Sequence, residues 1–104
     1  MTDSAGAMRI DKLLWFLRLA RTRSAAQKLV EAGHIRLNGR RVERSHCQIA
    51  IGDVLTIPLG RTVRVVQVLA MPTRRGPATE AQSCYRVLDE GQVFPIAAAN
   101  RNDA

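Results

Sequence analysis

Apolar side chains recur at helical spacing near the start of the chain. The repeat i, i+3, i+4, i+7 is formed by Ile10, Leu13, Leu14 and Leu17. This stripe predicts a helix over residues 10–20 with one buried face. Trp15 and Leu19 lie outside the stripe. Packing on later strands is the favoured explanation for both, and contact between Trp15 and a ligand is the alternative.

A second amphipathic segment follows after a short break. Its apolar residues are Ala26, Leu29 and Val30. Thr22 or Ser24 can cap its N-terminus, and Ser24-x-x-Gln27 matches a capping box. Gly33 stands where a left-handed residue commonly ends a helix. The pattern therefore predicts two short helices that pair on their apolar stripes.

Strand patterns begin after the second helix. Residues 34–42 alternate apolar and polar positions around Asn38-Gly39. This dipeptide favours a tight hairpin, because both turn positions take positive φ. Further on, Thr62–Met71 is rich in β-branched residues, which predicts one longer strand.

The segments around this longer strand are shorter and more broken. Residues 49–57 form two short apolar runs, after which Pro58 and Gly60 are expected to break the chain. Pro77 is expected at the first position of a short helix within residues 78–89, where apolar residues follow helical spacing.

The length of 104 residues fits one domain. Residues 1–7 and 91–104 lack a pattern and are interpreted as a flexible and a disordered tail. Residues 8–58 form the expected central module, and residues 59–90 extend the same domain by a strand and a helix.

Basic residues are concentrated in the first half of the chain. Residues 1–44 hold ten of the 16 Lys and Arg and four of the nine acids, so they account for nearly all of the net charge of +7. All but two of the basic residues are Arg, the side chain suited to bidentate capture of phosphate. The asymmetry predicts that the first half binds a polyanion.

Other classes of function find little support in the sequence. The two cysteines and two histidines show no metal-ligand spacing, so we expect no metal, no disulfide and no cofactor. No Gly-rich phosphate loop, H-E-x-x-H or G-x-S-x-G motif is present, and we expect no enzyme and no catalytic residue. Without an apolar run of membrane-spanning length or a secretory signal, a cytoplasmic protein with no membrane partner is expected.

Several motifs in order resemble the S4-type RNA-binding domain family. They are R-x-D-K-x-L from Arg9, T-R-S-x-A from Thr22, G-H-I-x-L-N-G from Gly33, and Gly52-Asp53-Val54. The resemblance covers about residues 8–58. It implies an α+β fold with two helices packed on a small, mostly antiparallel sheet, here followed by a longer strand and a short terminal helix. It also implies binding of structured RNA along the helices and the hairpin.

Within this family, two later motifs resemble a branch of small, ribosome-associated bacterial heat-shock proteins. They are R-T-V-R-V-V-Q-V and R-R-G-P-A-T-E-A. This resemblance implies binding of ribosomal RNA on free large ribosomal subunits, including those stalled with a nascent chain on tRNA, and a role in recycling them. Peptidyl-tRNA is then a further partner, and a monomer is expected. The branch has a long basic C-terminal extension, whereas Arg101 is the only basic residue within residues 91–104.

Two alternatives remain open at this point. The RNA can be a tRNA or a messenger RNA rather than ribosomal RNA. The protein can also be an interaction adaptor that uses an exposed apolar patch around Trp15, its basic surface serving solubility only.

RNA binding needs cations at phosphate spacing, donors for phosphate and 2′-hydroxyl oxygens, and close approach of the backbone. The start of the second helix offers free N–H groups and a dipole that favour an anion. The predicted RNA-binding residues lie on both helices and in the hairpin: Arg9, Lys12, Arg21, Arg23, Ser24, Gln27, Lys28, His34, Asn38, Gly39, Arg40 and Arg41.

Some of these residues have a structural alternative. Arg9 can pair with Asp11, which we expect to be a structural partner of a nearby Arg rather than a ligand. Ser24 can act as a helix cap, and Asn38 is first a turn residue. The pair Arg74-Arg75 is a candidate secondary anchor for RNA.

Overall fold

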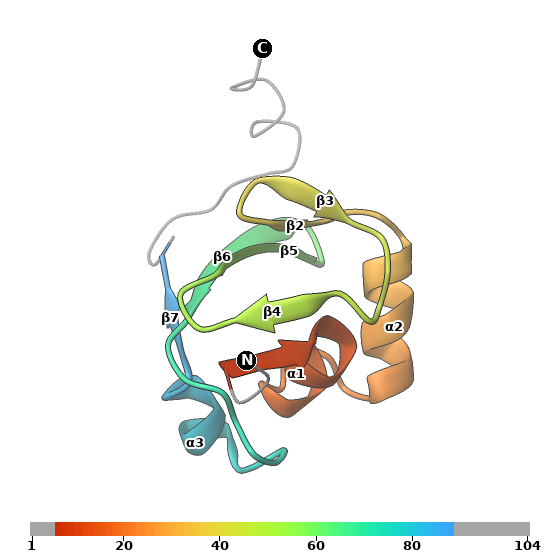
Figure 1. Cartoon of the computed structure of the whole chain (residues 1–104). Helices are drawn as coiled ribbons and strands as arrows, with labels where there is room; N and C mark the ends of the chain where they lie inside the picture. Colours follow the sequence, from red (N-terminus) through yellow and green to blue (C-terminus); the bar gives the residue numbers. More distant parts are fainter. Residues whose placement is uncertain (1–5, 89–104) are drawn as a thin grey trace.

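The computed structural model describes residues 6–88; residues 1–5 and 89–104 lie outside the described part, and with them most of the first expected tail and all of the second. Two helices and a two-stranded ribbon lie on one side of a five-stranded antiparallel sheet (Figure 1). The elements are β1 Ala7–Arg9, α1 Ile10–Phe16, α2 Arg23–Glu31, β2 Ile35–Leu37, β3 Arg40–Val42, β4 Gln48–Ala50, β5 Val54–Leu59, β6 Thr62–Val68, α3 Ala78–Gln82 and β7 Tyr85–Val87. The predicted α+β class is confirmed. Ala7, placed by the sequence pattern in the leading tail, pairs with Ala50.

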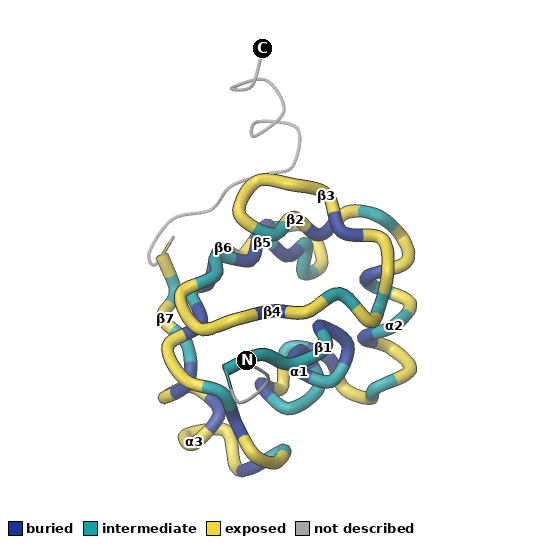
Figure 2. The backbone as a smooth tube through the Cα atoms, in the orientation of Figure 1, coloured by how far each residue is buried: buried dark blue, intermediate teal, exposed yellow. Residues whose placement is uncertain are grey.

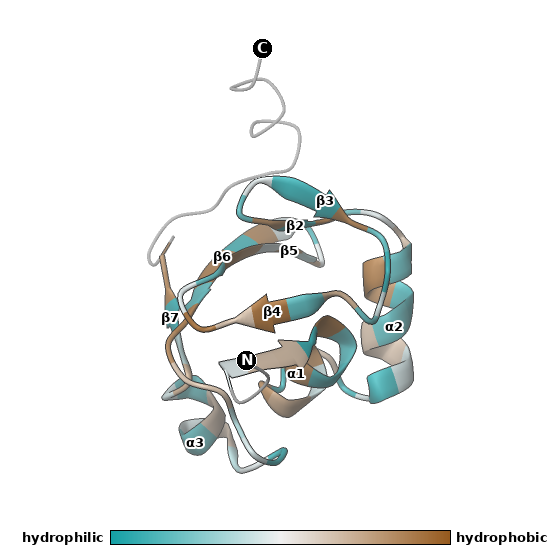
Figure 3. Cartoon of the chain, in the orientation of Figure 1, coloured by the Kyte–Doolittle hydropathy of each residue, from teal (hydrophilic) through white to brown (hydrophobic). Residues whose placement is uncertain are grey.

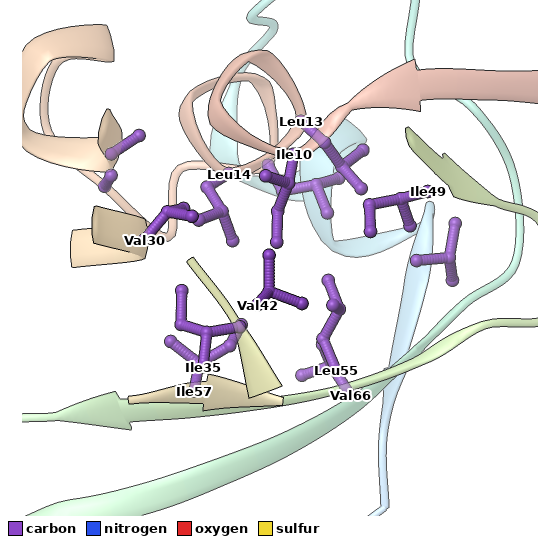
Figure 4. Packing of buried hydrophobic residues seen from close by; sticks show 14 of the residues in the cluster. Ile10, Leu13, Leu14, Val30, Ile35, Val42, Ile49, Leu55, Ile57 and Val66 are labelled. Atoms are coloured by element: carbon purple, nitrogen blue, oxygen red, sulfur yellow. The ribbon is translucent and has the colours of Figure 1, made fainter. Parts of the chain in front are cut away.

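The core lies between the helices and the sheet. The predicted stripe of α1 is confirmed, because all four of its residues are at most 1% exposed. Figure 4 shows Ile10, Leu13 and Leu14 facing residues of α2 and the sheet. The other labelled core residues are Val30, Ile35, Val42, Ile49, Leu55, Ile57 and Val66. Figure 2 shows the same division as buried segments facing inward and exposed segments at the hairpin and the outer side of α2.

The first helix is shorter than predicted. The pattern predicts a helix over residues 10–20, whereas α1 ends at Phe16. It ends because Arg18 takes a positive φ of 63°, and the N–H groups of the next two residues both donate to the Leu14 carbonyl oxygen. Arg18 Nε also donates to the Gly76 carbonyl oxygen at 2.6 Å, which favours this conformation.

The second helix has one of the two predicted caps. Thr22 Oγ1 accepts a hydrogen bond from Ala25 N–H at 3.0 Å, so Thr22 and not Ser24 is the N-cap. The predicted capping box is wrong, because the side chain of Gln27 donates to Asp11 instead. Gly33, with φ of 82°, follows the helix as predicted.

The predicted hairpin is confirmed. Strands β2 and β3 pair from Ile35↔Val42 to Leu37↔Arg40, and Asn38 and Gly39 take φ of 52° and 90°. This hairpin forms one edge of the sheet, whose strand order is β3-β2-β5-β6-β7.

The expected chain break at Pro58 is wrong. Pro58 lies within β5, opposite Val63 of β6, and the turn follows at Gly60. Strand β2 pairs with β5 only at Leu55 and Thr56. At Pro58 the strand therefore has one neighbour, and a missing N–H can be tolerated on the open side.

The C-terminal part of the described chain differs from the prediction. Strand β6 ends at Val68 rather than Met71, and α3 covers only Ala78–Gln82 of the predicted 78–89, with Pro77 as its N-cap. Helical spacing beyond Gln82 is misleading, because residues 85–87 form strand β7 along β6. The Cys84 carbonyl oxygen accepts bonds from the N–H groups after Val68, which draws the chain back to the sheet.

The exposed apolar residues do not surround Trp15, where the interaction-adaptor alternative requires an apolar patch. Among the described residues the exposed large apolar side chains are Ile51, Leu69 and Leu88. Trp15 is half-buried, and its ring centroid lies 5.6 Å from that of Phe16. Within residues 6–88, no helix has the length and apolar character needed to cross a membrane.

Candidate nucleic-acid interface

A single carboxylate organises the start of the two helices. Asp11 is fully buried, and it is the one buried charged residue among the described residues. Arg9 donates to both of its oxygens, from Nε at 3.0 Å and from Nη2 at 2.9 Å. Gln27 Nε2 donates at 3.1 Å, and Lys12 N–H donates at 2.7 Å. The expectation that Asp11 is a structural partner of a nearby Arg is confirmed.

Arg23 approaches the same carboxylate from α2. Its Nε lies 3.6 Å from Asp11 Oδ2, as an ion pair without a hydrogen bond. Three predicted RNA-binding residues, Arg9, Gln27 and Arg23, therefore converge on one acid. The side chains of Arg9 and Arg23 remain 41% and 39% exposed, so the buried acid keeps two partly exposed guanidinium groups close together.

The environment of Asp11 keeps it ionised. Burial acts to raise the pKa of this carboxyl, but hydrogen bonds from Arg9, Gln27 and the Lys12 backbone, together with the Arg9 charge, outweigh it. The pKa of Asp11 is therefore lowered from its ordinary value. The carboxylate is charged at neutral pH and can orient both arginines.

The lowered pKa of Asp11 predicts a pH dependence of stability. The unfolded chain binds the proton first as pH falls, so the stabilisation is fully present above the unfolded value of about 3.9 and is lost as pH falls through the lower folded pKa. We expect the difference in unfolding free energy between the parent protein and Asp11→Asn to shrink below about pH 4. Urea denaturation across this range measures it. A difference that stays constant as pH falls contradicts the assignment.

The other predicted residues on α2 and just before it are exposed to solvent. Arg21, Ser24 and Lys28 are exposed, and Arg21 directly precedes the N-cap. Within residues 6–88 neither Arg21 nor Lys28 has an acidic partner within ion-pair distance. Lys12 lies on α1, with Nζ 5.3 Å from the centroid of the Phe16 ring. These side chains can meet phosphates without first breaking an ion pair.

The hairpin presents the remaining predicted residues at the other end of α2. His34, Gly39, Arg40 and Arg41 are exposed, and Arg41 Nη1 lies 3.6 Å from Glu43 Oε2. That pair is exposed on both sides, so it contributes little stability and can open. The hairpin therefore adds exposed positive charge at the sheet edge.

The side chain of Asn38 is held within the fold. Its Oδ1 accepts from Val54 N–H at 2.9 Å, and its Nδ2 donates to Asp53 Oδ1 at 3.1 Å. Asp53 also accepts from Ala50 N–H at 2.8 Å. The expectation that Asn38 is first a turn residue is confirmed.

Replacing Asn38 by Ala is expected to reduce stability. The change removes both hydrogen bonds and places Ala at a positive φ, and we expect a loss of about 1–2 kcal/mol in unfolding free energy. Thermal or urea denaturation measures the loss. Unchanged stability, with a large loss of RNA affinity, would instead make Asn38 mainly a ligand-binding residue.

The predicted residues form a strip along α2 rather than one compact cluster. Helix α2 has nine residues and is about 13 Å long. Arg21 and Ser24 lie at the start of α2, and Gln27, near its middle, donates a hydrogen bond to Asp11. The hairpin follows the end of α2 (Figure 1). Figure 3 shows that β3 and parts of α2 are made of hydrophilic residues. We call the predicted set the basic strip: Arg9, Lys12, Arg21, Arg23, Ser24, Gln27, Lys28, His34, Asn38, Gly39, Arg40 and Arg41.

Two arginines outside the predicted set belong to the same surface. Arg36 of β2 is exposed, and its Nη1 lies 3.4 Å from the Gly39 carbonyl oxygen. Arg44 follows β3 and is exposed. The charge concentration in residues 1–44 is the signal that could have found both. In contrast, Arg74 bonds Glu80 and Arg75 Nε donates to the Trp15 carbonyl oxygen, so this candidate anchor makes intramolecular contacts.

The described residues include no cluster of metal-binding side chains. No group of three or more His, Cys, Asp or Glu side chains in residues 6–88 could hold an ion. Cys47 is half-buried and Cys84 buried, and neither forms a disulfide. The chemistry of this surface is that of positive charge and hydrogen-bond donors.

Comparison with known proteins gives consistent matches. The family model for the S4 domain matches residues 8–55. Heat shock protein 15 of Escherichia coli K12 is 36% identical over 78 residues, covering 75% of this chain and 58% of that protein. The heat shock protein 15 homolog of Haemophilus influenzae is 32% identical over 79 residues, covering 76% and 60%. The chain thus spans about three fifths of the length of these relatives.

Two further similarities concern a ribosomal protein and a solved structure. The small ribosomal subunit protein uS4 of Listeria monocytogenes is 43% identical over 49 residues, which is 47% of this chain and 24% of that protein. The trimeric structure of heat shock protein 15 from Vibrio cholerae superposes with a TM-score of 0.75 at 31% identity, covering 92% of each chain.

Proposed function

The chain belongs to the S4 domain family and is related to heat shock protein 15, and on that premise we propose that it binds structured ribosomal RNA through the basic strip. The observation that most supports this is the Asp11 cluster. A fully buried acid holds Arg9 by two hydrogen bonds and Arg23 by an ion pair, beside exposed cations that have no acidic partner in the described part of the chain.

The proposed mechanism is electrostatic capture combined with recognition of RNA shape. Contacts to phosphate oxygens supply affinity and depend on salt, whereas hydrogen-bond donors such as Ser24 fit phosphate and 2′-hydroxyl groups. The fixed spacing along α2 would favour a backbone held in one geometry over a flexible strand. No covalent step is involved.

The proposed partner is the free large ribosomal subunit, including subunits that carry a stalled nascent chain on tRNA. The support is the resemblance of the chain to heat shock protein 15 beyond the S4 module, since the matches with these relatives cover three quarters of the chain. Release of such subunits for reuse is the proposed role in the cytoplasm. The expected monomer stays a prediction, which light scattering tests against the trimer solved for the Vibrio cholerae relative.

Sedimentation on a density gradient tests this partner. We expect the tagged protein from a bacterial lysate to migrate with free large subunits at low salt and to leave them as salt increases. An Arg21→Glu/Lys28→Glu variant should remain at the top of the gradient. Migration with small subunits alone would overturn the choice of subunit. Absence from every ribosomal fraction would favour a tRNA or a messenger RNA.

A further inference from the structure

An open groove adjoins the hairpin end of the basic strip and shares residues with it, and it lies between the hairpin and the segment that leads into β4. Its volume is about 760 Å³. The lining residues come from one continuous stretch of chain and its hairpin: Leu37, Asn38, Arg40, Arg41, Val42, Glu43, Arg44, His46 and Cys47. Figure 1 shows this stretch leaving β3 and passing beside α2 before it enters β4.

The rim of the groove is positively charged. Arg40 and Arg44 are exposed, and among the described residues neither has an acid within ion-pair distance. Glu43 is the one acidic residue of the lining, and its pair with Arg41 is solvent-exposed. His46 adds an exposed imidazole ring. The rim therefore favours an anion.

The interior of the groove is less polar than its rim. Val42 is buried and belongs to the hydrophobic core, while Leu37 and Cys47 are half-buried against that core. A flat, weakly polar group can lie on these side chains while a phosphate meets the arginines. Apolar lining with a few charged groups at the margin is typical of small-ligand sites.

The segment that forms the far wall is hydrogen-bonded to the start of α1. Cys47 N–H donates to the Arg44 carbonyl oxygen at 3.0 Å and closes a turn. The N–H groups of Ile10 and Asp11 donate to the carbonyl oxygens of Cys47 and Ser45 at 2.8 and 3.2 Å. The turn that presents Arg44 and His46 is thus fixed to the helix that bears Asp11. The groove is continuous with the basic strip, because Arg40 and Arg41 belong to both.

We propose that this groove binds an unpaired nucleotide of the RNA held by the basic strip, with the base on Leu37, Val42 and Cys47 and the phosphate at Arg40 and Arg44. The inference rests on the proposed RNA-binding function and adds an element that the RNA must contain. Paired bases are stacked inside a duplex, whereas an unpaired base can enter a groove and be held by stacking and charge. A bulge, loop or single-stranded end next to a helix would supply it.

Two RNA probes separate the groove from the strip. One is a blunt RNA duplex, and the other is the same duplex with a short single-stranded uridine extension. We expect the extension to tighten binding to the parent protein about tenfold by fluorescence anisotropy. The Arg44→Ala/His46→Ala variant should lose most of this gain, measured as the ratio of its affinities for the extended and the blunt duplex. Arg61→Ala, an exposed arginine at the β5–β6 turn, is the control and should keep the gain.

Alkylation of Cys47 gives a readout that does not depend on affinity alone. We expect the extended duplex, at saturating concentration, to slow modification of Cys47 by iodoacetamide several-fold, and the blunt duplex to leave it unchanged. Mass spectrometry measures both thiols, with Cys84, which is 8% exposed, as the internal reference.

The outcomes distinguish the two proposals. Equal affinity for both RNAs, or a gain that persists in Arg44→Ala/His46→Ala with Cys47 unprotected, overturns the nucleotide groove and leaves the strip in place. Failure of the parent protein to bind either RNA in a salt-dependent way overturns the proposed function itself. A gain that is lost in the groove variant and retained in Arg61→Ala supports both.

Discussion

The Arg21→Glu/Lys28→Glu variant is expected to bind ribosomal RNA about a hundredfold more weakly than the parent protein at moderate salt. Both side chains are exposed, Arg21 just before the N-cap of α2 and Lys28 on α2, and neither has an acidic partner within ion-pair distance among the described residues. Each substitution removes a cation and puts a repelling carboxylate in its place. Fluorescence anisotropy with labelled ribosomal RNA measures the change, and circular dichroism checks that the fold is retained.

A matched control separates local contact from overall charge. Arg61→Glu/Arg86→Glu makes the same change in net charge at exposed positions on the β5–β6 turn and on β7. We expect it to weaken binding only a few-fold. An equal loss in both variants would show that net charge, and not the basic strip, determines affinity.

Arg23 is unsuitable for such a reversal. Its Nε lies 3.6 Å from the buried Asp11 carboxylate, so a Glu at this position would place two acids together and disturb the fold. The structure thus directs charge reversal to Arg21 and Lys28, whose side chains make no such contact in the described part of the chain.

The second large effect is expected on stability. Replacing Asp11 by Ala removes the hydrogen-bond acceptor shared by the Arg9 guanidinium and the Gln27 amide, and it removes the ion-pair partner of Arg23. We expect a loss of about 2–4 kcal/mol in unfolding free energy, near the lower end of the range for broken buried pairs because Arg9 and Arg23 are partly exposed. Urea denaturation at neutral pH measures it.

An exposed ion pair provides the control for Asp11. Glu80 accepts hydrogen bonds from Arg74 at 2.8 and 3.2 Å, but both residues are exposed. Replacing Glu80 by Ala should leave stability nearly unchanged. A similarly small effect of Asp11→Ala would mean that the cluster does not organise the helices. RNA affinity should also fall in Asp11→Ala, since Arg9 loses two hydrogen bonds and Arg23 loses its ion-pair partner.

Local patterns along the chain predicted the elements that local rules determine. The apolar stripe of α1, the turn at Asn38-Gly39 and the glycine after α2 follow from spacing and backbone preference. The end of α1 at Phe16 could not be predicted in this way, because the Arg18 conformation is favoured by a bond to Gly76, far along the chain. Strand β7 was missed for the same reason, since β6 overrides the helical spacing around Cys84.

The candidate site was predictable in part. Residue type and charge selected Arg9, Arg23 and Gln27, but their convergence on one buried acid depends on how α1 and α2 pack. The groove was not predicted, because Arg44 and His46 line it only when their turn is hydrogen-bonded to the start of α1. The spacing of residues along the sequence does not predict these backbone hydrogen bonds.

The salt dependence of RNA affinity tests the central claim most directly. The dissociation constant for ribosomal RNA is measured at a series of salt concentrations for the parent protein and for Arg21→Glu/Lys28→Glu. If the basic strip neutralises about five phosphates, the logarithm of the binding constant falls with the logarithm of salt at a slope of about −3.5 to −4.5, and the variant has a shallower slope. A slope near zero for the parent protein would contradict electrostatic capture of RNA by the basic strip.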